Sequence, residues 1–240
     1  MRRVLNGKIK PFLANSLWLL FCYKKHLAFQ RAIKNVEKTQ RMVLANIMEK
    51  NKNTEYGRLY GFKEITDIDR YRVNVPLTTY ESYQGYINSI ADGQMSVLTS
   101  ERVTMLAPTS GSTVTSKHIP YTAGLKEEFQ KGIAPWIFDL FTHRKKILSG
   151  RAYWSVTPVN MQQFKTTGGI PVGFEEDTEY FGFVERYFLR VLLTVPKEVA
   201  LIQDIDAFRY VTLLFLLREK YLTFISVWNP SFLTLLLKPL

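Results

Sequence analysis

The spacing of apolar residues predicts several helices. From Ala28 to Lys50, apolar side chains recur every three or four residues among Lys, Arg and Gln, which is typical of an amphipathic helix. Thr122 fits the N-cap of a long helix with an apolar stripe that extends to Phe141. The same pattern predicts helices over 67–72, 79–90, 185–194 and 206–219, and a last helix that begins at Asn229 and Pro230.

Three apolar runs predict strands, and each is followed by a loop and a helix. They are Val103–Ala107, Ala152–Val156 and Leu222–Trp228, and Val97–Thr99 adds a short one. Strand, loop and helix in alternation indicate an α/β fold with a mostly parallel sheet flanked by helices. We expect ligands at the carboxyl ends of these strands. Residues 161–181, rich in glycine and then in acids, are expected to cross the surface.

Positive charge is concentrated near the N-terminus. The net charge is +11, and residues 1–60 hold 13 Lys or Arg against 3 Asp or Glu. Such a surface attracts nucleic acid or anionic membranes, but no nucleic-acid signature accompanies it, so we favour a solvated basic helical face and expect no nucleic-acid partner. The single cysteine, Cys22, excludes a disulfide framework and indicates a reducing, cytoplasmic location.

The run Phe12–Tyr23 follows four basic residues and has the outline of a signal peptide. It is too short to span a bilayer, and Lys24 and Lys25 stand where a cleavage site would need small residues. A buried N-terminal helix is the favoured interpretation. A chain held on a membrane surface by this segment is the less favoured alternative, for which binding to liposomes should fall as salt rises.

The segment between Pro108 and His118 carries the clearest chemistry. A glycine among Ser and Thr residues exposes backbone N–H groups and hydroxyls that suit anionic oxygens, and a lysine adds a full charge. This loop predicts a phosphate-binding site made of Thr109, Ser110, Gly111, Ser112, Thr113 and Lys117.

The loop resembles the phosphate-binding motif of the acyl-adenylate-forming, firefly-luciferase-like superfamily, although Val114 and Ser116 replace its usual Gly and Pro. The flanking segments narrow the resemblance to the auxin-responsive acyl-acid amido synthetase family, in a form similar to its bacterial members. These segments are NTEYGRLYGF, VPLTTYESYQGYI, GQMSVLT, KHIPYT, AYWSVTP, GGIPVGFEEDTEYFG and ISVWNPSFLTLLL.

Enzymes of that family activate a carboxylic acid with ATP and then form an amide with an amino acid. The resemblance therefore implies ATP and Mg²⁺ as cofactors, and a small carboxylic acid and an amino acid as substrates. It also places an acyl pocket, by location only, near Leu125, Phe129 and Trp228. No catalytic residue and no metal ligand is assigned.

The family's adenylating domain is longer than 240 residues, so the resemblance implies a single incomplete domain. Residues 1–52 form its basic helical segment, and residues 53–240 the N-terminal part of the adenylating domain. We expect such a chain to be inactive alone and to need a complementary C-terminal polypeptide. The alternative is a non-catalytic truncated or split remnant that acts as an interaction module.

Overall fold

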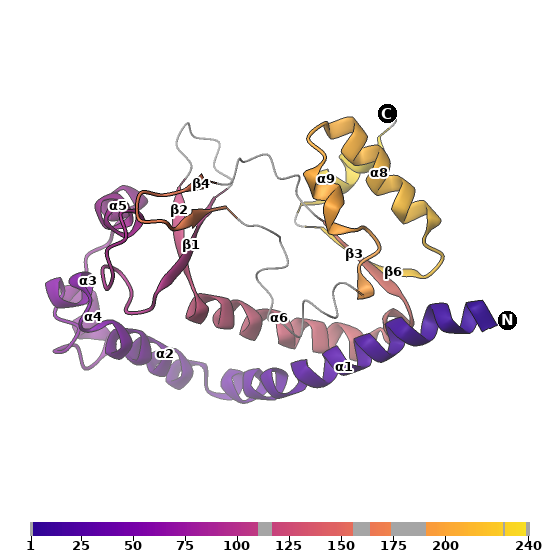
Figure 1. The fold of residues 1–240 in the computed structure, drawn as a ribbon. Coiled ribbons are helices and arrows are strands. Elements are labelled where there is room, and N and C mark those ends of the chain that lie inside the picture. The colour runs from indigo at the N-terminus through magenta and orange to yellow at the C-terminus, as the bar shows by residue number, and fades with distance from the viewer. Residues whose placement is uncertain (1, 110–116, 156–163, 174–190, 228, 239–240) are drawn as a thin grey trace. The chain divides into compact units, whose positions relative to one another are not determined.

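The computed structural model describes residues 2–109, 117–155, 164–173, 191–227 and 229–238 (Figure 1). The chain forms two compact units that interleave along the sequence. Unit 1 comprises Met1–Leu27, Gln130–Gln162 and Glu175–Leu240, and unit 2 comprises Ala28–Phe129 and Gln163–Phe174. The number of domains remains a prediction.

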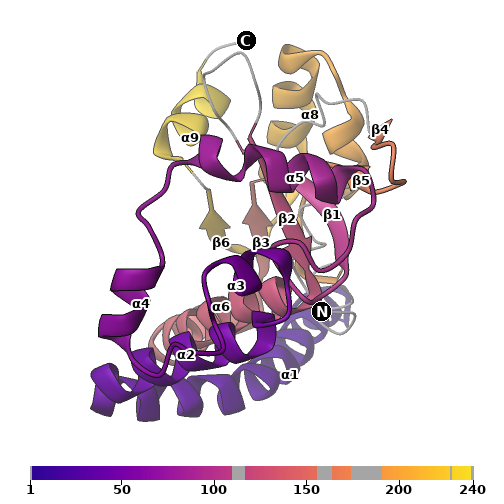
Figure 2. The ribbon, with the colours of Figure 1, turned by 90° about the vertical axis from the view of Figure 1, so that its left-hand side faces the viewer.

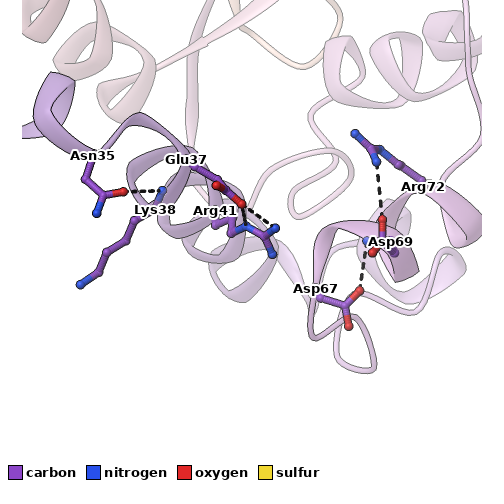
Figure 3. A network of polar contacts seen from close by, with 7 residues as sticks. All are labelled: Asn35, Glu37, Lys38, Arg41, Asp67, Asp69 and Arg72. Atoms are coloured by element: carbon purple, nitrogen blue, oxygen red, sulfur yellow. Dashed lines mark hydrogen bonds and ion pairs between the residues drawn. The ribbon is translucent and has the colours of Figure 1, made fainter.

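Two helices of unit 2 begin at side chains that accept hydrogen bonds from free backbone N–H groups, as Figure 3 shows. The Asn35 side chain accepts from the N–H of Lys38, and the Asp67 carboxylate accepts from those of Asp69 and Arg70. The predicted helices over 28–50, 67–72 and 79–90 are therefore present, with a 3₁₀ turn inside the first and at the start of the last. The elements are the end of α1 (Arg2–Ala32), η1 (Ile33–Asn35), α2 (Val36–Asn51), α3 (Glu55–Leu59), α4 (Ile68–Asn74), η2 (Tyr80–Tyr83) and α5 (Gln84–Ala91).

Unit 2 holds a four-stranded sheet in the order β2-β1-β5-β4 (Figures 1 and 2). The strands β1 (Val103–Pro108) and β2 (His118–Thr122) form an antiparallel hairpin. The strand β5 (Pro171–Val172) lies parallel to β1, and β4 (Phe164–Lys165) is antiparallel to β5. A core of Ile90, Val97, Leu106 and Val172 packs against this sheet.

Unit 1 contains a two-stranded parallel sheet of β3 (Arg151–Trp154) and β6 (Leu222–Ser226). One core joins Ala14, Trp18 and Cys22 of α1 to Ile137 and Phe141 of α6 (Ala123–His143), and a second core includes Tyr153, Phe208 and Leu236. The remaining elements are η3 (Lys145–Ser149), η5 (Lys197–Leu201), α8 (Ile205–Arg218) and α9 (Pro230–Leu237).

The prediction of a mostly parallel sheet is wrong. The described strands form two small sheets, and β1–β2 and β4–β5 are antiparallel pairs. The segment His118–Thr122, expected to lead directly into a helix, returns along β1 as β2, and residues 164–172, expected to cross the surface, add β4 and β5. Residues 97–99 do not form the predicted strand, and Val97 and Leu98 lie in a bend.

The prediction of a buried N-terminal helix holds for one face only. Trp18 and Cys22 are each 3% exposed, whereas Leu13 and Leu20 are 55% and 68% exposed. No helix in the described ranges is long and apolar enough to cross a membrane.

Candidate functional site

The predicted phosphate loop is the connection of a β-hairpin. Pro108 at the end of β1 pairs with His118 at the start of β2. One residue further, the N–H of Thr109 donates to the carbonyl oxygen of Lys117 at 2.8 Å. The hairpin therefore brings together the first and last residues of the predicted site. Ser110, Gly111, Ser112 and Thr113 lie outside the described residues.

The amine of Lys117 contacts two residues of η2. Its Nζ is 5.0 Å from the centre of the Tyr80 ring and 3.5 Å from Oε1 of Glu81. The Tyr80 hydroxyl donates to the carbonyl oxygen of His118 at 3.1 Å and accepts from the His118 N–H at 2.7 Å. Tyr80 thus fixes the start of β2 through its hydroxyl and attracts the lysine through its ring.

Glu81 is the electrostatic competitor of any anion at Lys117. The Thr79 hydroxyl, the residue's own backbone N–H and the charge of Lys117, in that order, hold the pKa of the Glu81 carboxyl below its usual range. The Lys117 and Glu81 side chains are 42% and 73% exposed. An ion pair this exposed contributes little to stability, so a phosphate could displace the carboxylate.

Tyr80 and Glu81 were not among the predicted site residues. The available signal was their segment, Val75–Ile87, which is one of those that carry the family resemblance. Their proximity to Lys117 depends on the return of β2, which the sequence reasoning did not predict.

The helix α6 follows the hairpin and begins at a second polar cluster. The Thr122 hydroxyl accepts from the N–H of Leu125, which confirms Thr122 as the N-cap. The Glu101 carboxylate accepts from the N–H of Gly124 at 2.7 Å and pairs with Lys50. Hydrogen bonds from Lys50, from the Thr122 hydroxyl and from the Gly124 N–H lower the pKa of Glu101 to about 2. The start of α6 is thereby tied to the segment that precedes β1.

The acyl-pocket assignment remains a prediction. Leu125 and Phe129 lie on the first two turns of α6, where Leu125 is 39% exposed and Phe129 is half-buried. Trp228 lies outside the described residues. Among the described residues, no group of three or more His, Cys, Asp or Glu side chains is arranged to hold a metal ion, so no Mg²⁺ ligand is assigned.

A cavity of about 490 Å³ lies at the opposite end of β1 from the loop and contains no predicted site residue. Its walls are residues 93–97, Thr99, residues 101–104 and residues 168–171, together with Ile90. Gly168 donates to the carbonyl oxygen of Ala91 at 2.9 Å, and a side chain at Gly168 would collide with the backbone of Gly93. The close approach of Gly168 to Gly93 therefore explains why two segments that carry the resemblance, GQMSVLT and GGIPVGF, meet at this cavity.

Comparison with known proteins gives a consistent result. Residues 26–240 match the model of the GH3 family N-terminal domain. The jasmonoyl-L-amino acid synthetase JAR4 of Nicotiana attenuata is 28% identical over 191 residues, which are 78% of this chain and 33% of that protein. The probable indole-3-acetic acid-amido synthetase GH3.1 of Arabidopsis thaliana is 31% identical over 99 residues, 41% of this chain and 16% of that protein.

The fold is also found among solved structures. That of the GH3.15 acyl acid amido synthetase superposes with a TM-score of 0.69 at 24% identity, over 88% of this chain and 37% of that one. The chain therefore spans about a third of the length of JAR4 and of this structure. These matches confirm the resemblance drawn from the sequence.

Proposed function

The chain belongs to the GH3 family, and we propose that it provides the phosphate-binding part of an acyl-acid amido synthetase site. The reaction is the activation of a carboxylic acid with ATP, followed by amide formation with an amino acid. The observation that carries this proposal is the base of the hairpin, where the N–H of Thr109 donates to the carbonyl oxygen of Lys117 and the lysine amine lies over the Tyr80 ring.

The donors at this loop fit the phosphates of ATP. Backbone N–H groups and hydroxyls in a glycine-containing turn stabilise anionic oxygens, and Lys117 adds a charge that opposes the negative charge on departing pyrophosphate. Exchange of Glu81 for a phosphate oxygen would leave the cation–π contact with Tyr80 in place. Mg²⁺, when bound, would neutralise part of the remaining phosphate charge.

We further propose that this chain alone does not complete adenylation and acts with a complementary polypeptide. The coverage of about a third of the relatives supports this. So does the sheet of unit 1, in which the described residues form two strands and Ile225 of β6 is 44% exposed. Parallel sheets are normally covered on both faces. A further polypeptide segment packed on β6 would cover the exposed side of this sheet.

Two measurements test these proposals. In calorimetric titration with MgATP, Lys117→Met should weaken binding at least tenfold, whereas Lys165→Met, on exposed β4, should leave it unchanged. Equal affinities for the two variants would remove Lys117 from the site. In ATP–pyrophosphate exchange with a panel of carboxylic acids, the chain alone should show no more exchange than Lys117→Met does. Exchange well above that variant would show that this chain is sufficient.

The second candidate function is a non-catalytic interaction module. It is favoured by exposed apolar side chains on α8 and α9, such as Leu217 and Leu237 at 84% and 65%. The two functions differ in their genetic context. A neighbouring reading frame that continues the family pattern would favour a split enzyme, and its absence, together with absent MgATP binding, would favour the module.

A further inference from the structure

The helix α1 has two apolar faces, and only one of them is covered. Ala14, Trp18 and Cys22 recur every four residues and are buried in the core of unit 1. On the other side, Ile9, Leu13, Leu17 and Leu20 are 47%, 55%, 48% and 68% exposed. At about 100° per residue, these four side chains fall within an arc of about 80° and extend over about 17 Å of helix. We call these four residues the outer α1 face.

Basic residues flank this face, and acidic residues are absent from its segment. Residues 1–36 contain eight Lys or Arg and no Asp or Glu. Lys10 and Lys24 are exposed, stand near the two ends of the outer α1 face, and form no ion pair with any described residue. Lys8 and Lys25 contact the fold instead, over the Tyr221 ring and at Gln130.

We propose that the outer α1 face binds the surface of an anionic lipid bilayer. An apolar row bordered by lysines matches the acyl-chain boundary and the charged headgroups of such a surface. The opposite face of α1 is held in the core of unit 1 through Ala14, Trp18 and Cys22, so the outer α1 face is the one that would meet the lipid surface. From the sequence alone, a chain held on a membrane surface was the less favoured alternative. The exposure of the outer α1 face is the reason to prefer it.

The outer α1 face lies outside the part of the chain that matches the GH3 family model. Its binding partner is therefore not expected to be one that all members of the family share. The match to the GH3 family model begins at residue 26, and the outer α1 face ends at Leu20. A protein partner would need an apolar groove bordered by acidic side chains to match this face. A lipid surface needs only the row of apolar side chains and the two lysines.

The test is co-sedimentation of the full chain with vesicles of phosphatidylcholine alone or with 30% phosphatidylserine, a composition of about one anionic lipid in three. At 50 mM salt we expect binding to the anionic vesicles only, and a loss of at least tenfold in partitioning at 500 mM salt. Leu13→Ser with Leu20→Ser should lower partitioning at least tenfold. Lys10→Gln and Lys24→Gln should each lower it about fivefold.

The matched controls are exposed residues elsewhere. Leu59→Ser with Leu77→Ser removes the same side chains from positions that are 63% and 105% exposed, and Lys63→Gln removes an equivalent charge. These variants should bind within twofold of the parent chain, with unchanged circular dichroism throughout. No binding to anionic vesicles at low salt overturns the proposal, as do equal losses in face and control variants. A light-scattering dimer that Leu13→Ser with Leu20→Ser dissociates, without an effect on vesicle binding, would assign the face to a second copy instead.

Discussion

Glu101 should make the stability of this chain depend on pH in the acid range. Its carboxylate is 21% exposed, pairs with Lys50 and accepts the N–H of Gly124 at the start of α6. These contacts lower its pKa from an ordinary value of 4.5 to about 2. The perturbation we consider is Glu101→Gln, which keeps an acceptor for Gly124 and removes the charge.

The magnitude follows from the linkage between protonation and folding. A pKa lowered from 4.5 to about 2 corresponds to at most about 3 kcal/mol at neutral pH, and partial exposure reduces this to roughly 2 kcal/mol. Because the folded-state pKa is the lower one, the stabilisation is complete above pH 4.5 and is lost as the pH falls through about 2. By pH 3, less than about half of it should remain.

The assay is urea unfolding of the parent chain and Glu101→Gln at pH 7 and pH 3. Urea is preferred because guanidinium is a salt and screens charges. The parent should exceed the variant by roughly 2 kcal/mol at pH 7 and by less than about 1 kcal/mol at pH 3. Glu49→Gln removes the same charge from an ion pair whose glutamate is 72% exposed, and should change stability by less than about 0.5 kcal/mol at either pH. A difference between parent and Glu101→Gln that stays constant from pH 7 to pH 3 would refute the reasoning.

Three further predictions concern contacts between distant parts of the chain. Asn15, 3% exposed, donates from Nδ2 to the carbonyl oxygens of Leu148 and Gly150 at 2.9 and 3.1 Å, so Asn15→Leu should reduce the free energy of unfolding by about 2–3 kcal/mol in urea. A side chain at Gly150 would collide with Thr223 and with the carbonyl oxygen of Tyr221, so Gly150→Ala should lower Tm, whereas Gly132→Ala, in α6 with open space around it, should raise stability by about 0.5–1 kcal/mol. Tyr80→Phe keeps the ring beside Lys117 but removes both hydrogen bonds to His118, so it should reduce stability by about 1–2 kcal/mol and speed amide exchange at His118, as measured by NMR.

The features that the sequence predicted well are local ones. Thr122 and Asn229 are the N-caps that were expected, because a short side chain that accepts nearby N–H groups acts within three residues. The strands β3 and β6 were also anticipated, since short apolar runs bounded by polar residues favour strands, although β6 contains no buried residue. Apolar periodicity located α2 and α6, capping and helix-ending residues indicated α4 and α5, and the apolar run VTLLFLL indicated α8.

The strands that were missed carry too little local signal. Strand β2 contains Pro120, which argues against a strand, yet β2 lies at the edge of its sheet, where a missing N–H is tolerated. Strands β4 and β5 have two residues each, fewer than an alternating pattern needs. They become strands because Leu106, fully buried on β1, pairs with Val172.

The missed hairpin changes the interpretation of the candidate site. A loop that leads into a helix would leave Lys117 with no fixed neighbours, whereas β2 returns along β1 and places the lysine at the base of the loop. There it meets Tyr80 and Glu81, and the Tyr80–His118 contact spans 38 residues. The residue types of the loop indicate affinity for an anion, and we propose that Glu81 weakens that affinity because a phosphate would have to displace its carboxylate from Lys117. If the Glu81 carboxylate competes with phosphate for Lys117, Glu81→Gln should raise the affinity for MgATP, whereas Lys117→Met should lower it. Equal affinities of Glu81→Gln and the parent chain would show that the carboxylate does not compete.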